Sequence, residues 1–390
     1  MKTDTDTLNR EAMSIPAEGL VGALKERIER KRETLAERDR RFGADRVRIS
    51  SYMENIGWPE LFGYDMNRFF TDAEFALEQA LRQRIFWLDN SLDDDLPGLQ
   101  IPCEAGHYYD MTLFGLPVTH DRDGVPQFGH HPIADEPDLS VIEPFDFRRT
   151  GAMPRLLRHY EGMCEHAVTR YGGEVAITFP NFNRGPLDVC MQVRGYESFV
   201  ADMHERPGFA HEFLELVADE RARWRAERRS YLGLESPDRP RRIDDDWVNV
   251  PFITPGIFRE FVAPIYARIQ RNEGPIEGWH SCGDFTEVAA DLLRALPDLK
   301  TLEVSGWTDL ERLDSLARAE LPFFVSFKNA FVLSGSEQRH RALLGRIARL
   351  AGRRPVSVCA QAIVKLHGSY AEDIGRMNRF IRRARKAFAC

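Results

Sequence analysis

Short apolar runs alternate with longer amphipathic stretches from about residue 172 to the end of the chain. The apolar runs cover residues 175–179, 242–246, 276–280, 299–304, 322–327 and 355–359. The stretches with helical spacing of apolar residues cover residues 208–232, 256–271, 285–296, 309–318, 336–352 and 369–388. Buried strands read as short apolar runs and surface helices as a 3.6-residue period. The alternation therefore predicts a parallel sheet covered by helices.

The N-terminal part has a different pattern. Residues 21–43 carry a narrow apolar stripe in a highly charged background, which predicts a helix packed against the rest of the protein. A second helix is predicted over residues 71–90, with Thr71 as its N-cap and Glu74 three residues later. Residues 91–150 are rich in Pro, Gly, Asp and His, so we expect long loops with short strands there.

Six strand–helix units with two less regular units upstream predict a (β/α)₈ TIM barrel of the α/β class. The alternative is an open, doubly wound sheet, which would carry a glycine-rich phosphate turn after an early strand, and the sequence has no such turn. We expect an N-terminal helical extension over residues 1–95 and a catalytic barrel over residues 96–390.

Composition narrows the class of protein. Hydrophobic residues make up 43% of the 390 residues and charged residues 29%, which is typical of a globular chain. The net charge of −8 argues against nucleic-acid binding, which uses a basic face. The chain lacks an apolar run long enough to cross a bilayer and an apolar signal segment, so a cytoplasmic protein without a membrane partner is expected. Six cysteines form no disulfide framework and are expected as thiols.

Polar residues follow the predicted strands, and in a barrel the carboxyl ends of all strands meet at one mouth. The candidates for contacts with a small-molecule substrate are Asn181, Asn183, Asp245, Trp247, Glu303 and Lys328. Lys328 and Glu303 are also candidates for a buried ion pair, which we expect more than a contact with an anionic substrate.

His280, Cys282 and Cys359 are the candidate metal ligands. His280 and Cys282 lie two positions apart at a strand end, so both side chains point the same way. Cys359 ends another strand and lies on the same predicted rim. One imidazole and two thiolates suit Zn²⁺ and leave one position open for a substrate. Buried cysteines and a hydrogen-bonded histidine are the alternative explanation of these residues.

Several segments carry a resemblance to a known family. These are residues 183–187 (Asn-Arg-Gly-Pro-Leu), 245–247 (Asp-Asp-Trp), 251–253 (Pro-Phe-Ile), 258–264 (Phe-Arg-Glu-Phe-Val-Ala-Pro), 278–283 (Gly-Trp-His-Ser-Cys-Gly) and 356–359 (Val-Ser-Val-Cys). From about residue 170 onward, and more loosely from about 65, the chain resembles the uroporphyrinogen decarboxylase superfamily, and within it the zinc-dependent cobalamin methyltransferases. The His-x-Cys pair with a distant Cys is the specific part.

The resemblance implies a barrel enzyme whose zinc ion binds a thiol, or another methyl donor or acceptor, near a corrinoid. Asp246 and Glu260 are then candidate catalytic carboxylates that fill the fourth zinc position in the resting state. The chain has no Asp-x-His-x-x-Gly signature, so methylcobalamin is expected on a partner corrinoid protein. The absence of an Arg-Gln-Ala-Gly-Arg-like segment near the N-terminus argues against uroporphyrinogen as the substrate.

Two other functions stay open. One is a zinc-assisted decarboxylase or lyase-like enzyme of the same superfamily without cobalamin, in which the acidic run 244–246 supplies a base. The other is a barrel without catalysis that acts as a binding protein, against which the presence of all three ligand residues argues.

Overall fold

The computed structural model describes residues 10–44, 46–104, 106–236 and 241–389. Its main element is a six-stranded parallel sheet in the order β1-β10-β9-β8-β7-β6. The strands are β1 (Arg48–Met53), β6 (Arg242–Asp244), β7 (Gly278–His280), β8 (Thr301–Ser305), β9 (Phe323–Phe327) and β10 (Val356–Ile363). Five of them fall on the predicted apolar runs, so the parallel α/β class is confirmed.

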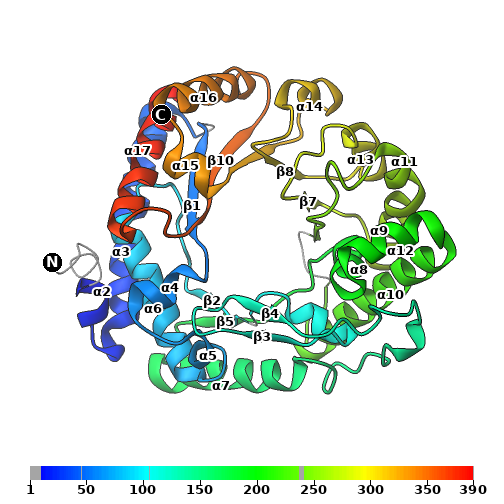
Figure 1. Ribbon diagram of the computed structural model, residues 1–390. Helices are drawn as coiled ribbons and strands as arrows, with labels where there is room; N and C mark the ends of the chain where they lie inside the picture. The colour runs from blue at the N-terminus through cyan, green and yellow to red at the C-terminus, as the bar shows by residue number, and fades with distance from the viewer. Residues whose placement is uncertain (1–9, 45, 105, 237–240, 390) are drawn as a thin grey trace.

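Two smaller sheets accompany the main one. β2 (Gln100–Pro102) pairs in parallel with β5 (Ala176–Thr178), and β3 (Val118–His120) forms an antiparallel pair with β4 (Pro126–Phe128). The strands lie inside and most helices outside (Figure 1). Because the ladders of the described residues join six strands in one sheet and two in another, closure into one eight-stranded barrel stays a prediction.

A long helix precedes β6, and further helices follow the strands from β6 to β10, largely as the apolar periodicity predicts. They are α10 (Pro207–Tyr231), α11 (Pro255–Ile257) continuing through a π-helical turn (Phe258–Val262) into α12 (Ala263–Glu273), α13 (Ala289–Ala295), α14 (Leu310–Leu316), α15 (Asn329–Ser334), α16 (Glu337–Ala351) and α17 (Tyr370–Phe388). Ile374, Met377 and Ile381 of α17 are fully or almost fully buried, because their spacing places them on the face that packs against α15 and α16. The helices α7 (Met153–Tyr171), α8 (Pro186–Arg194) and α9 (Tyr196–Glu205) lie outside the stretches predicted from apolar spacing, and α8 follows the Gly-Pro segment that the family resemblance places before a helix.

The N-terminal region contains α2 (Arg10–Ser14), α3 (Leu20–Phe42), α4 (Gly57–Phe62), α5 (Met66–Phe69) and α6 (Ala73–Asn90). The predicted cap of α6 is wrong by one residue. Asp72 accepts a hydrogen bond from the Phe75 amide at 3.1 Å, whereas the Thr71 hydroxyl donates to the Asn67 carbonyl in the preceding turn. β1 lies inside the range 1–95 that was predicted as an extension, and it pairs with β10.

Residues 91–150 contain only short elements, as expected. Besides β2, β3 and β4 they include two 3₁₀ helices, Tyr109–Phe114 and Leu139–Val141. Among the described residues, no helix is both long and apolar enough to cross a membrane.

Alternation along the strands places polar side chains on the inner face of the sheet. On β8, Leu302 and Val304 are completely buried apolar residues, and the residue between them is the carboxylate Glu303. On β10, Val358 and Ala360 alternate with Cys359 in the same way. The apolar set faces the helices, so the polar set faces inward, where a site can form.

His159 of α7 gives a test of the packing outside this inner face. It is 4% exposed, neither ring nitrogen has a hydrogen-bond partner among the described residues, and burial lowers the pKa of its imidazole to about 4. The folded protein therefore resists protonation of His159, whereas the unfolded chain takes up the proton below about pH 6.5.

We predict that the free energy of unfolding decreases as the pH falls from 6.5 toward 4, by up to about 3 kcal/mol from this group. Urea unfolding of the native chain and of His159→Phe at several pH values measures it. The variant should lose less stability than the native chain over this range, and parallel curves would contradict the prediction.

Candidate metal centre

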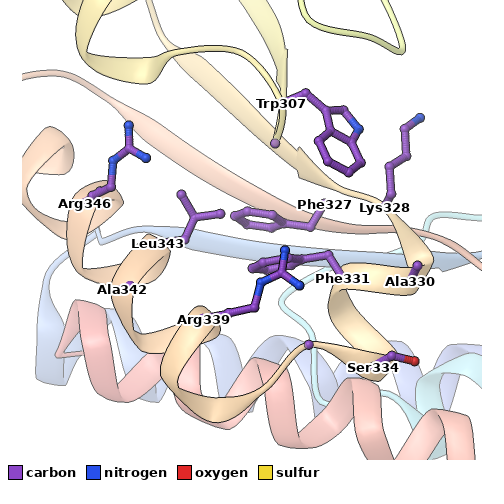
Figure 2. A pocket seen from close by; sticks show the side chains of 12 residues that line it. Trp307, Phe327, Lys328, Ala330, Phe331, Ser334, Arg339, Ala342, Leu343 and Arg346 are labelled. Atoms are coloured by element: carbon purple, nitrogen blue, oxygen red, sulfur yellow. The ribbon is translucent and has the colours of Figure 1, made fainter.

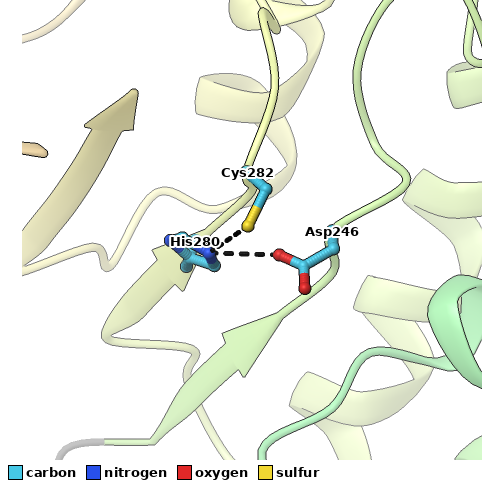
Figure 3. Close-up of side chains that lie close together, drawn as sticks. All are labelled: Asp246, His280 and Cys282. Carbon is cyan, nitrogen blue, oxygen red and sulfur yellow. Dashed lines mark hydrogen bonds and ion pairs between the residues drawn. The ribbon is translucent and has the colours of Figure 1, made fainter. Parts of the chain in front are cut away.

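Asp246, His280 and Cys282 converge after the carboxyl ends of β6 and β7 (Figure 3). Nε2 of His280 lies 3.1 Å from a carboxylate oxygen of Asp246 and 3.3 Å from Sγ of Cys282. One potential ligand atom from each residue lies within 4.8 Å of the other two. An imidazole, a thiolate and a carboxylate are the donor types that zinc binds, so these three side chains fit a zinc ion.

The backbone brings the three residues together because β6 and β7 are parallel neighbours. Asp244 is paired with His280, and the amide of Asp245 donates to the His280 carbonyl at 2.9 Å. Ser281 in turn donates its hydroxyl proton to the Asp246 carbonyl at 3.3 Å. The two segments that follow the strands are therefore tied to each other, which fixes Asp246 beside the His280–Cys282 turn.

A glycine permits this close packing. The Asn249 amide side chain donates to the Asp246 carbonyl and lies 3.4 Å from the Ser281 hydroxyl. A Cβ atom at Gly283 would overlap the side chain of Asn249. The glycine that ends the His-Ser-Cys-Gly turn is thus required for steric reasons, not for a special backbone conformation.

Glu303 holds the second nitrogen of the histidine. Its carboxylate lies 3.0 Å from Nδ1 of His280, accepts from Arg242 at 2.7 Å and from Gln361 at 3.2 Å. Burial acts to raise the pKa of Glu303, but the charges of His280 and Arg242 outweigh it and lower the pKa to about 2. A carboxylate behind a histidine is the usual arrangement that orients a metal-binding imidazole.

Neighbouring charged groups also shift the pKa values of His280 and Asp246. Burial opposes the charged imidazole, yet contacts with Asp246, Cys282 and Glu303 raise the pKa of His280 well above its usual value. Burial likewise acts to raise the pKa of Asp246, and His280, Cys282 and Arg184 reverse this and lower it. Both shifts favour a proton on His280 and an ionised Asp246, and metal binding through Nε2 would release that proton.

Two cations flank the cluster. The Lys328 ammonium donates to Sγ of Cys282 at 3.3 Å, and Arg184 lies 4.0 Å from Asp246. Arg184 also bonds Asp110 and Asp188, and its guanidinium lies 4.5 Å from the centre of the Tyr108 ring. Both cations can attract an anionic group of a substrate toward the cluster.

Cys359, the third predicted ligand, is not part of this group. It is buried on β10, which is three strands from β7 in the sheet order. Neighbouring strands lie about 4.8 Å apart, so the side chain must reach across the interior to meet Cys282. Burial raises the pKa of the Cys359 thiol to about 12. Its role as a ligand stays a prediction, and Asp246 supplies the third ligand atom of the group.

The other predicted site residues fall into two sets. Glu303 and Lys328 both contact the cluster, but the expected ion pair between them is wrong, because Glu303 bonds Arg242 and Lys328 bonds Cys282. Glu260 is exposed in the π-helical turn and is not a member of the cluster.

The other residues that were predicted to contact a substrate interact with neighbouring residues of the protein. Asn181 accepts from Arg225, and Trp247 stacks on Tyr196. The carbonyl of Asn183 accepts from the amide of Asp244.

Asp245 is completely buried, and its carboxylate accepts from the Asp188 amide at 2.8 Å and from the Tyr266 hydroxyl at 3.1 Å. It therefore anchors α8 and α12 rather than facing a substrate.

Sequence reasoning missed Arg184, Arg242 and Gln361 as site residues. Arg184 precedes Gly185 and Pro186 in one of the segments that carry the family resemblance, so a signal for it existed. Arg242 lies inside a predicted strand, where the pattern alone does not tell an inward polar side chain from an outward one. Gln361 lies two residues beyond the predicted strand 355–359, and the observed strand β10 continues through it.

Comparisons with known proteins leave the family open. No family model matches the chain, and no curated protein matches it in sequence. Among solved structures, it is similar to a methyltransferase from Methanosarcina mazei, with a TM-score of 0.58 and 16% sequence identity over 89% of this chain and 95% of the other. A likeness at this identity shows a shared fold and no more.

The cluster predicts one zinc ion per chain. We expect His280→Ala and Cys282→Ser to lose zinc affinity by well over 100-fold, and Glu303→Gln to lose about 10- to 100-fold because it orients the imidazole. Cys359→Ser should keep its zinc within a few-fold. Competition with a chromophoric chelator measures all four variants, with Cys164→Ser of α7 as the control.

Proposed function

We propose that this protein is a zinc-dependent methyl (alkyl) transferase that acts between a corrinoid and a thiol or a methylated small molecule. In this proposal the ligands are Asp246, His280 and Cys282, and the corrinoid is methylcobalamin on a separate partner protein. The observation that carries the proposal is the convergence of three potential ligands: a carboxylate oxygen of Asp246 and Sγ of Cys282 lie 3.1 Å and 3.3 Å from Nε2 of His280.

The donor set supports a metal ion at this point. The Asp246 oxygen that faces His280 is buried and lies 3.1 Å from Nε2 without a well-aligned hydrogen bond, so a metal ion bound between the two groups would give this oxygen a directed partner. Three protein ligands leave a zinc position open, which is the arrangement of catalytic sites. When bound there, zinc supplies Lewis acidity that favours the thiolate form of a substrate thiol.

We also propose that the strands close into a (β/α)₈ barrel with this site at its mouth. Backbone hydrogen bonds outside the paired strands link both edge strands of the main sheet, β1 and β6, to the segments that lie next to them. The Asp94 amide donates to the Ile49 carbonyl of β1, and the Gly185 amide donates to the Asp244 carbonyl of β6. The β2–β5 pair lies between these two connections along the chain. Active sites of such barrels lie where the strands end, as this cluster does.

The residues around the cluster have distinct roles in the proposed transfer. Glu303 keeps Nε2 of His280 directed at the cluster, and Lys328 places a positive charge beside the sulfur of Cys282. Arg184 binds an anionic part of the substrate or holds Asp246 in place through their 4.0 Å contact. Burial of His280 and Glu303 limits the access of water to this side of the site.

The transfer itself is tested with the zinc-loaded protein, methylcobalamin and a panel of thiols. We expect the methylcobalamin spectrum to be converted to that of the demethylated cobalamin with at least one thiol, and the rate to fall by at least 100-fold in Cys282→Ser. Since the proposal includes a partner corrinoid protein, the assay is repeated with corrinoid proteins as methyl donors. An unchanged spectrum with every donor and thiol, for protein that holds one zinc per chain, contradicts methyl transfer to thiols and leaves the zinc site standing.

A further inference from the structure

Figure 2 shows a cavity of about 560 Å³ that has Lys328 in its lining. Its walls come from the segment that follows β8, from the end of β9, from α15 and from α16, so it lies between the sheet and the helices that cover it. Lys328 lines this cavity and also donates to the sulfur of Cys282. The cavity and the metal cluster are therefore neighbours that share one side chain.

The floor and one wall of the cavity are aromatic. The rings of Phe327 and Phe331 stack with their centres 5.3 Å apart and their planes 20° apart, and Leu343 lies next to them. Trp307 stands at the edge and is 65% exposed, which is uncommon for so large an apolar side chain. Flat apolar walls of this kind favour a flat ligand, because rings gain both burial and stacking.

The charges of the lining are all positive. Lys328, Arg339 and Arg346 line the cavity, and its lining contains no Asp or Glu. The Arg346 guanidinium donates a hydrogen bond to the Glu311 carboxylate at 2.7 Å, whereas Arg339 has no carboxylate partner within the described ranges. Arg339 instead lies with its guanidinium 5.9 Å from the Phe331 ring. An anionic ligand group would thus meet a guanidinium that is free to form a bidentate pair.

We propose that this cavity binds an aromatic carboxylate, with the ring against Phe331 and Trp307 and the carboxylate on Arg339. The volume suits a small molecule, since ligand pockets typically measure about 300–1,000 Å³. The further idea that this ligand is the substrate of the neighbouring metal centre rests on the proposed function. The binding of an aromatic carboxylate in the cavity does not depend on that function.

Calorimetric titration of the zinc-loaded protein with benzoate tests the site. Cyclohexanecarboxylate keeps the charge without the flat ring, and benzamide keeps the ring without the charge. We expect benzoate to bind at least tenfold more tightly than either, since one lacks stacking and the other lacks the charged hydrogen bond.

Two variants locate the binding. Arg339→Gln should weaken benzoate binding about tenfold or more, and Trp307→Ala should weaken benzoate more than cyclohexanecarboxylate. Arg341→Gln is the matched control, because Arg341 is on the same helix, pairs with Glu337 and does not line the cavity. Benzoate binding that is absent, or equal in Arg339→Gln and Arg341→Gln, overturns the proposal.

A metal-site variant separates this proposal from the proposed function. His280→Ala should bind benzoate within a few-fold of the native chain, because the imidazole is not part of the cavity lining. Benzoate binding that is intact in a protein without methyl transfer overturns the transfer function alone. Benzoate binding that is lost in His280→Ala, in a variant that remains folded by circular dichroism, overturns a separate cavity site.

Discussion

The parallel register of three neighbouring strands is the constraint on which the site depends. β6 pairs with β7 and β7 with β8, so Asp244, His280 and Glu303 come from adjacent strands. His280 then lies between two carboxylates, with Glu303 at one ring nitrogen and Asp246 at the other. A slip of one residue at β7 would turn the imidazole outward and place Trp279, whose burial is almost complete, on the inner face. The apolar packing of Trp279 outside the sheet therefore also fixes the position of the histidine.

The sequence predicted the elements of this arrangement better than their mutual distances. His280 and Cys282 could be paired from sequence, because two positions along an extended segment always point the same way. Glu303 and Lys328 could be placed at strand ends because the apolar runs 299–304 and 322–327 end at or just before them. Whether Cys359 or Asp246 lies near the His280–Cys282 pair depends on the order of strands around the sheet. That order depends on which strand pairs with which, and hydrophobic periodicity does not contain this information.

In the proposed function, a ligand set with Asp246 in place of Cys359 is acceptable in its charge. One thiolate and one carboxylate offset the +2 charge of a zinc ion as fully as two thiolates do. A carboxylate oxygen donates less electron density than sulfur, however, so a third, substrate thiolate would be held by a more electrophilic ion. Lys328 next to Cys282 acts in the same direction. In the proposed transfer, both features would favour tight binding of an anionic substrate over high nucleophilicity of its sulfur.

The neighbouring cavity has a lining of positive charge, in contrast to the carboxylates of the metal cluster. Lys328 lies between the cluster, where the carboxylates of Asp246 and Glu303 gather, and the cavity, whose lining is positive. A ligand with one anionic group is repelled by the carboxylates unless a metal ion neutralises them, whereas Arg339 attracts it in either state. If the cavity and the metal cluster act together as proposed, the anionic end of the substrate binds on the α16 side and its other end approaches the cluster past Lys328. That orientation places the reactive group at the strand ends, where the imidazole and the thiol converge.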